Sequence, residues 1–208
     1  MLHFFFPRWV FVLALLVLPG MEVWAKSPAG YKPVSGDVIF QSFPHNPLTD
    51  LIESATESTY SHCGLVVVRP GGAVVLEAIG PVTETPLEQW IARGRDGAFA
   101  VYRLRHEYAG RVGEIIQAAN RFRGRPYDSR YRFDDEKIYC SELVFKAFQK
   151  VTGEELGVVR KLAEFNWKPN EAAIRRLEGG GLPLERKMIS PKDLAAARQL
   201  RLVLDAAL

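Results

Sequence analysis

YCSELV, at residues 139–144, marks the point where a polar, loop-like stretch gives way to an amphipathic helix. Apolar residues at helical spacing predict that this helix begins at Cys140, runs through Val151 and ends at Gly153. A cysteine at a helix N-terminus has its thiolate stabilised by the helix dipole and by unpaired backbone N–H groups. Cys140 is therefore a candidate nucleophile. Free cysteines are also among the most often buried residues, so an inert Cys140 is the alternative.

One histidine lies in a setting that suits the partner base of such a nucleophile. Residues 60–68 read YSHCGLVVV, and a strand predicted over 62–69 would hold His62 on a rigid element. Cys63 follows His62 directly, so we expect its side chain on the opposite face of the strand, away from Cys140. Because the chain has only two cysteines, a disulfide scaffold is excluded, and a bond between these two is the less favoured alternative.

A carboxylate inside an apolar strand is the candidate third member of the site. Glu77 lies in a strand predicted over 73–79, and the PGG sequence at 70–72 predicts a hairpin with the histidine strand. Pairing across this hairpin puts Glu77 on the face of His62, where it could orient the imidazole. A buried carboxylate needs such a partner, because burial without one is costly. The alternative is an edge-strand glutamate that faces solvent.

A tyrosine in the loop at 124–128, which reads GRPYD, is the candidate substrate contact. We expect Tyr127 to line the site around Cys140. The alternative is that Tyr127 and its neighbour Asp128 serve only the turn.

The remaining pattern predicts an α+β fold, in which a small antiparallel sheet packs against helices. Strands are expected over 36–41, 62–69, 73–79 and 98–104. Helices are expected over 46–55, 85–93, 112–122, 140–151 and 190–202. Two of these helices carry cap predictions: Asn46 begins the first, and Thr85 begins a capping box for the second.

The N-terminal residues 1–25 have the pattern of a secretory signal peptide. The apolar run 9–18 is shorter than the roughly 20 residues that a spanning helix needs, and cleavage is predicted after Ala25. An uncleaved anchor is the alternative, because phenylalanines at 4–6 extend the apolar stretch. We therefore expect an exported, periplasmic protein whose residues 26–208 form a single domain without a membrane span.

Composition and motifs narrow the function further. The net charge is +3 with scattered Lys and Arg, which argues against nucleic acid as a partner. No Cys/His cluster has zinc spacing, and neither a His-Glu-x-x-His motif nor a Gly-rich phosphate loop occurs. The sequence therefore predicts no metal and no cofactor.

Five segments together resemble a known family. GDVIFQ at 36–41, YSH at 60–62, LEA at 76–78, GRPYD at 124–128 and YCSELV at 139–144 are similar to the YiiX/YaeF-type proteins. These proteins are circularly permuted members of the NlpC-type, papain-like cysteine peptidase superfamily. In them, as here, the histidine precedes the cysteine along the chain, the reverse of ordinary papain-like enzymes. The resemblance extends from about residue 34 into the 190s.

The resemblance implies a circularly permuted papain-like fold and an amidase-like cysteine hydrolase. The family's Cys-His-Glu triad maps onto Cys140, His62 and Glu77, whereas Cys63 departs from the small or apolar residue usual in relatives. The expected reaction is cleavage of amide bonds in small peptide or amino-acid substrates derived from the cell envelope. Two alternatives stay open. A wide apolar groove beside Cys140 would favour an acyltransferase or thioesterase, and a triad not assembled in space would favour a non-catalytic envelope-binding module.

Overall fold

The computed structural model describes residues 30–206 of the chain. The predicted signal peptide at 1–25 and its cleavage after Ala25 lie outside the described residues, so the division of the chain at that point stays a prediction. Within 30–206, no helix combines the length and the apolar character that crossing a membrane would require.

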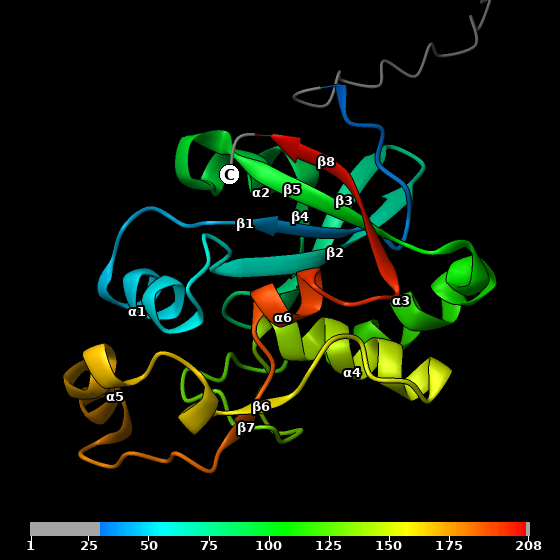
Figure 1. The fold of residues 1–208 in the computed structure, drawn as a ribbon. Helices are drawn as coiled ribbons and strands as arrows, with labels where there is room; N and C mark the ends of the chain where they lie inside the picture. The colour runs from blue at the N-terminus through cyan, green and yellow to red at the C-terminus, as the bar shows by residue number, and fades with distance from the viewer. Residues whose placement is uncertain (1–29, 207–208) are drawn as a thin grey trace, which may run out of the picture.

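A six-stranded antiparallel sheet with the order β4-β3-β2-β1-β5-β8 forms the centre of the molecule (Figure 1). The order explains the burial of β2 and β3, because each has a strand on both sides. The strands are β1 (Val38–Gln41), β2 (His62–Arg69), β3 (Gly72–Ala78), β4 (Val82–Pro86), β5 (Phe99–Leu104) and β8 (Leu200–Ala206). The predicted α+β class, with a small antiparallel sheet packed against helices, is confirmed.

Each face of the sheet carries its own apolar cluster, because side chains alternate along a strand. On one face Phe40 and Leu65 pack with residues of α4 (Cys140–Thr152) and α3 (Val112–Asn120). On the other face Val66 and Val75 pack against α2 (Leu87–Arg93). Figure 1 shows α2 on the opposite side of the sheet from α3 and α4, so the strands are covered from both sides.

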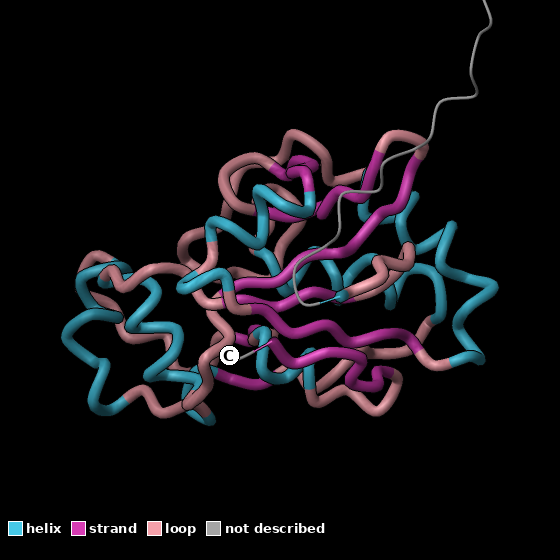
Figure 2. The backbone as a smooth tube through the Cα atoms, turned by 90° about the horizontal axis from the view of Figure 1, so that it is seen from above, coloured by secondary structure: helices cyan, strands magenta, loops and turns pink. Residues whose placement is uncertain are grey.

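A smaller lobe lies beside one end of the sheet, and Figure 2 shows its helices and loops projecting from one side of the magenta strands. The backbone N–H of Asn166 donates to Ala55 O at 2.9 Å, and this bond joins the lobe to α1. The lobe contains β6 (Arg160–Lys161), α5 (Glu171–Glu178) and β7 (Lys187–Met188). Its neighbours are α1 (Pro47–Thr56) and α6 (Pro191–Ala195). Short 3₁₀ turns lie at η2 (Arg95–Gly97), η3 (His106–Arg111), η4 (Leu162–Glu164) and η5 (Lys168–Asn170).

Two cap predictions had different outcomes. The Asn46 side chain caps α1 by accepting from the N–H groups of Leu48 and Thr49 at 3.0 Å, as its position before Pro47 predicts. The capping box predicted from Thr85 is wrong, because that residue lies inside β4 and α2 begins without a side-chain cap. Pairing of β4 with β3 therefore overrode the local helix-start signal.

The helix predicted over 190–202 is also wrong in its second half. Ser190 begins it as expected, but α6 ends at Ala195 and the chain returns as strand β8 from Leu200. The free edge of β5 explains the change, because pairing with it gives hydrogen-bond partners to the backbone of 200–206. Such a non-local partner is not visible in a helical spacing of apolar residues.

Candidate active site

His62 is the first residue of β2, and two aromatic rings enclose it. The Phe43 ring stacks on the imidazole with a centroid distance of 4.6 Å and an interplanar angle of 25°. The Trp90 ring, from α2, lies at 6.0 Å and 30°. His62 is 2% exposed, so its orientation is fixed by packing before any hydrogen bond is considered.

Glu77 lies next to His62 and is fully buried. Its Oε2 atom lies 2.5 Å from Nε2 of His62, and the same oxygen accepts from Nε1 of Trp90 at 3.0 Å. Thr85 donates to Oε1 at 2.5 Å, and Arg93 Nη2 reaches both oxygens at 2.8 and 2.6 Å. The solvent-facing alternative for Glu77 is therefore excluded, because every side of this carboxylate has a partner.

The register of the hairpin explains why Glu77 meets His62. Leu65 pairs with Leu76, and continuing this register by one residue puts Glu77 opposite Gly64. The backbone approaches closely there, since a Cβ added at Gly64 would overlap Val75 Cγ1 and lie 3.3 Å from Glu77 Cβ. Glycine at position 64 thus leaves room for the carboxylate to reach the ring of His62 two residues earlier.

Cys140 is the first residue of α4 and is 3% exposed. The residues on both sides of Cys140 are anchored to one distant residue. Ile189 N–H donates to the Tyr139 hydroxyl at 3.0 Å, and Ser141 Oγ donates to the Ile189 carbonyl at 2.8 Å. Glu142 accepts from the Tyr139 N–H at 3.3 Å, which satisfies one of the free donors at the helix start. Cys140 is therefore held in a fixed position at the end of the sheet.

The protonation of the three side chains follows from their contacts. Burial lowers the pKa of His62, but hydrogen bonds to Cys140 and Glu77 and the charges of both raise it to about 9. Burial raises the pKa of Glu77, yet its bonds to His62 and Arg93 bring it to about 2. A hydrogen bond from the Cys63 side chain lowers the pKa of Cys140 against its burial, and His62 lowers it further. The arrangement therefore favours a thiolate at Cys140 beside an imidazolium at His62.

The prediction that Cys63 faces away from Cys140 is wrong. Cys63 does point to the face opposite His62, but that face is the one covered by α4, so both cysteines belong to the same apolar cluster. Residues 62–64 pair with β1 but not with β3, so this end of β2 has a paired strand on one side, and both His62 and Cys63 contact Cys140 there. Both cysteines are free and buried, and burial raises the pKa of Cys63, which favours its neutral thiol.

Tyr127 lies near Cys140, but Tyr131, further along the same loop, is the tyrosine that lines the cavity. The rings of Tyr127 and Tyr131 meet edge to face at 6.4 Å, and burial followed by the charges of Tyr131 and Cys140 raises the Tyr127 pKa. Tyr131 lines the cavity next to Cys140 and has a φ of 52°, an uncommon value for a residue other than glycine. The role of Tyr127 as a substrate contact stays a prediction, and Tyr131 joins it as a candidate.

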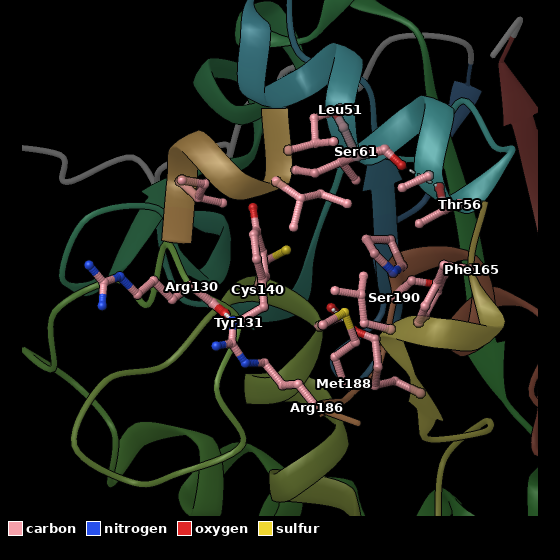
Figure 3. Close-up of a pocket in the computed structure, with 18 of the residues that line it drawn as sticks. Leu51, Thr56, Ser61, Arg130, Tyr131, Cys140, Phe165, Arg186, Met188 and Ser190 are labelled. Atoms are coloured by element: carbon pink, nitrogen blue, oxygen red, sulfur yellow. Dashed lines mark hydrogen bonds between the residues drawn. The ribbon is translucent and has the colours of Figure 1, made fainter. Parts of the chain in front are cut away.

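An apolar cavity opens beside Cys140 (Figure 3). Its walls come from α1, α5, the turn that ends at Phe165 and the segment 186–191, and Cys140 and Ser141 also line it. Figure 3 labels Leu51, Phe165 and Met188, one residue from each of three walls. Arg130 and Arg186 lie together at one side of the cavity. No single stretch of sequence contains these residues, and hydrophobic periodicity could not indicate that they share a cavity.

One cluster in the described part of the chain has the donor types of a metal site. One ligand atom each from His45, Asp50 and Glu53 lies within 4.8 Å of the others. However, Glu53 already accepts from Ser42 and binds Arg95 at 3.0 Å, and His45 is 70% exposed. A guanidinium bound to one of the ligands would repel a cation, so we assign no metal to this cluster.

The residues that hold Glu77 are not evident from the sequence. The motif at Thr85 predicts a helix cap, and no motif places Trp90 or Arg93 at the site. The spacing of Trp90 and Arg93 was the available signal, because residues three apart on a helix share a face. Using that signal required knowing that α2 packs on β3, which is a tertiary contact.

The order of the elements along the chain defines the class of protein. A histidine strand and its glutamate hairpin come first, and the cysteine helix follows and docks on the sheet, which is the arrangement of a circularly permuted papain-like protein. The chain belongs to the family of permuted papain-like amidase enzymes of the YaeF/YiiX type, whose family model matches residues 32–204. The family resemblance and the permuted fold expected from the sequence are both confirmed.

Two relatives illustrate the match. The uncharacterized protein YiiX of Escherichia coli K12 is 35% identical over 195 residues, which cover 92% of this chain and 93% of that protein. A crystal structure titled metalloprotein yiiX, from Escherichia coli O157:H7, superposes with a TM-score of 0.79 at 36% identity. That superposition covers 84% of this chain and 98% of the solved one.

Proposed function

We propose that this protein is a cysteine hydrolase that cleaves amide bonds in small peptide or amino-acid substrates, with Cys140, His62 and Glu77 as its triad. The observation that carries the proposal is the position of His62. Its Nε2 atom is bound to Glu77 at 2.5 Å, which leaves Nδ1 for the Cys140 thiol. The membership of the chain in a family of amidase enzymes supports the same reaction class.

The reaction would begin with attack of the Cys140 thiolate on the substrate carbonyl carbon, forming a tetrahedral intermediate. The backbone N–H of Cys140, at the start of α4, is free to donate to the developing oxyanion. Imidazolium at His62 then gives its proton to the leaving amine, and the C–N bond breaks to leave a thioester. Water, deprotonated by neutral His62, hydrolyses the thioester and returns the thiol.

Glu77 would act through His62 and not on the substrate. The carboxylate fixes the imidazole and stabilises its protonated form, while Arg93 and Thr85 keep the carboxylate ionised despite its burial. Without Arg93, the buried charge of Glu77 would be stabilised by His62 and by the hydrogen bonds from Thr85 and Trp90. We therefore assign Glu77 a positioning and electrostatic role in the proposed triad.

An acyltransferase or thioesterase is the second candidate, and the apolar cavity beside Cys140 is the observation that favours it. All of these reactions share the acyl-enzyme thioester. They differ in the bond first broken, which is an amide or a thioester, and in the acceptor, which is water or an amine. Product analysis with and without an added amine separates the three.

The test of the proposed function is covalent labelling of the intact protein with thiol-reactive amide and acyl probes. The expected result is one label, at Cys140 by peptide mass mapping, and loss of labelling in Cys140→Ala. Cys63→Ala is the matched control, because it removes the other buried thiol; the label should stay at Cys140 but form more slowly, since the hydrogen bond from Cys63 is lost. Labelling at neither cysteine, or equally at both, would contradict the proposal and favour a non-catalytic binding module.

We further propose that residues 1–25 direct export to the periplasm, where envelope-derived substrates would be available. Support comes from the sequence pattern alone, with its short apolar run and small-x-small site. N-terminal sequencing of the protein from a periplasmic extract should give Lys26 as the first residue. Recovery of the full-length chain from membranes would support a retained anchor instead.

A further inference from the structure

The cavity beside Cys140 is apolar over nearly all of its surface. Leu51 and Ile52 of α1, Phe165, Ile174 of α5 and Met188 form its walls. The charged residues of the lining lie together at one side, where Arg186 is paired with Glu178 and donates to the Arg130 carbonyl at 2.6 Å (Figure 3). A charged substrate group in the cavity would therefore lose its hydration without gaining a partner along most of the wall.

The position of the cavity relative to the proposed triad decides which part of a substrate enters it. The lining includes Cys140 and Ser141 but not His62. In the proposed mechanism the leaving amine lies over His62, because that residue protonates it. The cavity therefore lies on the other side of the attacked carbon, and the acyl part of the substrate points into it.

The size of the cavity limits the group that fits. Its volume is about 90 Å³. An engineered apolar cavity of roughly 150 Å³ holds one benzene molecule of six carbons, so this one has room for roughly four carbons. That is the size of an aliphatic amino-acid side chain, and a long fatty acyl chain would extend beyond the cavity.

From the walls, the position and the size, we infer that this protein selects amides whose acyl residue carries an aliphatic side chain of about the size of leucine or methionine. The inference rests on the proposed function, since it places the acyl group next to the Cys140 thiolate. Each methylene seated in an apolar pocket changes the specificity of an enzyme by roughly 10–200-fold. A leucyl residue should therefore react at least about tenfold faster than a glycyl residue.

The test uses N-acetyl-aminoacyl chloromethyl ketones, which carry the side chain on the acyl side and alkylate a thiolate without turnover. The thiolate displaces chloride, and one carbon–sulfur bond forms. The rate constant for alkylation of Cys140 in the full chain is measured by intact mass for glycyl, leucyl, lysyl and glutamyl probes. The expected order is leucyl first, by about tenfold or more over each of the others.

Filling the cavity should remove the preference without removing the reaction. Ile174→Trp and Met188→Phe place larger side chains in the cavity from two different elements, and neither residue belongs to the proposed triad. Both variants should lower the leucyl rate by about tenfold or more and the glycyl rate much less, so that the two rates become about equal. Val158→Phe is the matched control, because Val158 is 63% exposed and is not part of the lining.

The outcomes separate the two claims. Equal leucyl and glycyl rates, a faster lysyl or glutamyl probe, or a preference that survives both cavity variants in folded protein would overturn the inference, while labelling at Cys140 would still support the proposed function. Failure of every probe to label Cys140 would contradict the proposed function and the inference together. A melting temperature for each variant identifies any that is not folded, and the other cavity variant then decides.

Discussion

The two sides of Cys140 are built in opposite ways. The charged side consists of His62, Glu77, Trp90 and Arg93, and every polar contact there is set by the register of β2, β3 and β4 or by α2. The apolar side consists of the cavity walls, which come mainly from short helices and connecting segments outside the six-stranded sheet. Directional hydrogen bonds determine the geometry of the charged side, whereas the apolar side only has to be apolar and of the right size.

This contrast predicts where substitutions act. Changes on the charged side should lower kcat, because they alter the groups that develop charge during the reaction. Changes on the apolar side should alter KM and the choice of substrate. Five measurements can sharpen or break this division.

Removing the charge of Glu77 should give the largest effect. We expect Glu77→Gln to lower kcat by up to about 10⁴-fold, the loss seen for the comparable substitution in a serine triad, with a small change in KM. Glu84→Gln is the matched control, because Glu84 lies on the neighbouring strand β4 and pairs with Arg69 and Arg123 instead of with His62. A kcat for Glu77→Gln equal to that of the control would break the assignment of the charged side.

Replacing His62 should slow the reaction of the Cys140 thiol with alkylating reagents. In His62→Ala, the pKa of Cys140 should rise toward its ordinary value, because the imidazolium that stabilises the thiolate is gone. Each unit of that rise costs about tenfold in thiolate at pH values well below it. The alkylation rate of Cys140 with a small reagent at pH 6 should therefore fall by tenfold or more, while that of Cys63 stays slow in both proteins.

The pH profile of the wild-type protein follows from the same groups. The active form carries a proton on His62, whose pKa is raised to about 9, so kcat/KM should fall as the pH rises through about 9. Glu77 has its pKa lowered from 4.5 to about 2, so its contribution to stability is present above about pH 4.5 and is lost as the pH falls toward 2. An alkaline limb near pH 6.5 would mean that His62 has its ordinary pKa.

Replacing Gly64, where the backbone of β2 closely approaches β3, should lower the stability of the protein. A methyl group there overlaps Val75, so Gly64→Ala should lower the free energy of unfolding by about 1–3 kcal/mol and reduce kcat as Glu77 is displaced. Gly113→Ala is the control, because a Cβ at that helical glycine meets nothing within 4 Å. That control should be neutral or stabilising by about 0.4–1 kcal/mol in urea denaturation.

The smallest effect is expected on the apolar side. Met188→Ala enlarges the cavity and leaves His62 and Glu77 unchanged. The KM for a leucyl amide should therefore rise by roughly tenfold or less, while kcat stays the same. A fall in kcat as large as that of Glu77→Gln would show that the two sides do not act separately.

The sequence predicted the parts of the fold whose signals are local. The apolar run over 62–69 and helical spacing after Cys140 predicted β2 and α4, and the turn at 70–72 predicted the hairpin that brings Glu77 to His62. Strands β4 and β8 were missed because they exist through pairing with β3 and β5, which a local pattern does not contain.

The three residues of the proposed triad could be named from the sequence, but the residues that hold them in place could not. Cys63 was misplaced because the alternation rule says which face a side chain takes but not what covers that face. Trp90 and Arg93 come from α2, and the cavity walls come from segments that meet only in the folded protein. Long-range packing thus determines the surroundings of residues that short motifs can identify.

The bonds from Ile189 to Tyr139 and Ser141 have a consequence for the timing of synthesis. A ribosome releases the histidine and glutamate strands first, then the cysteine helix, and only some fifty positions later the residue that anchors the start of that helix. A nascent chain can thus build the base half of the site while its cysteine is still unanchored. The start of the cysteine helix would thus be fixed later than the base half of the site, so a polypeptide truncated before Ile189 should carry a Cys140 thiol that is less well positioned and reacts more slowly.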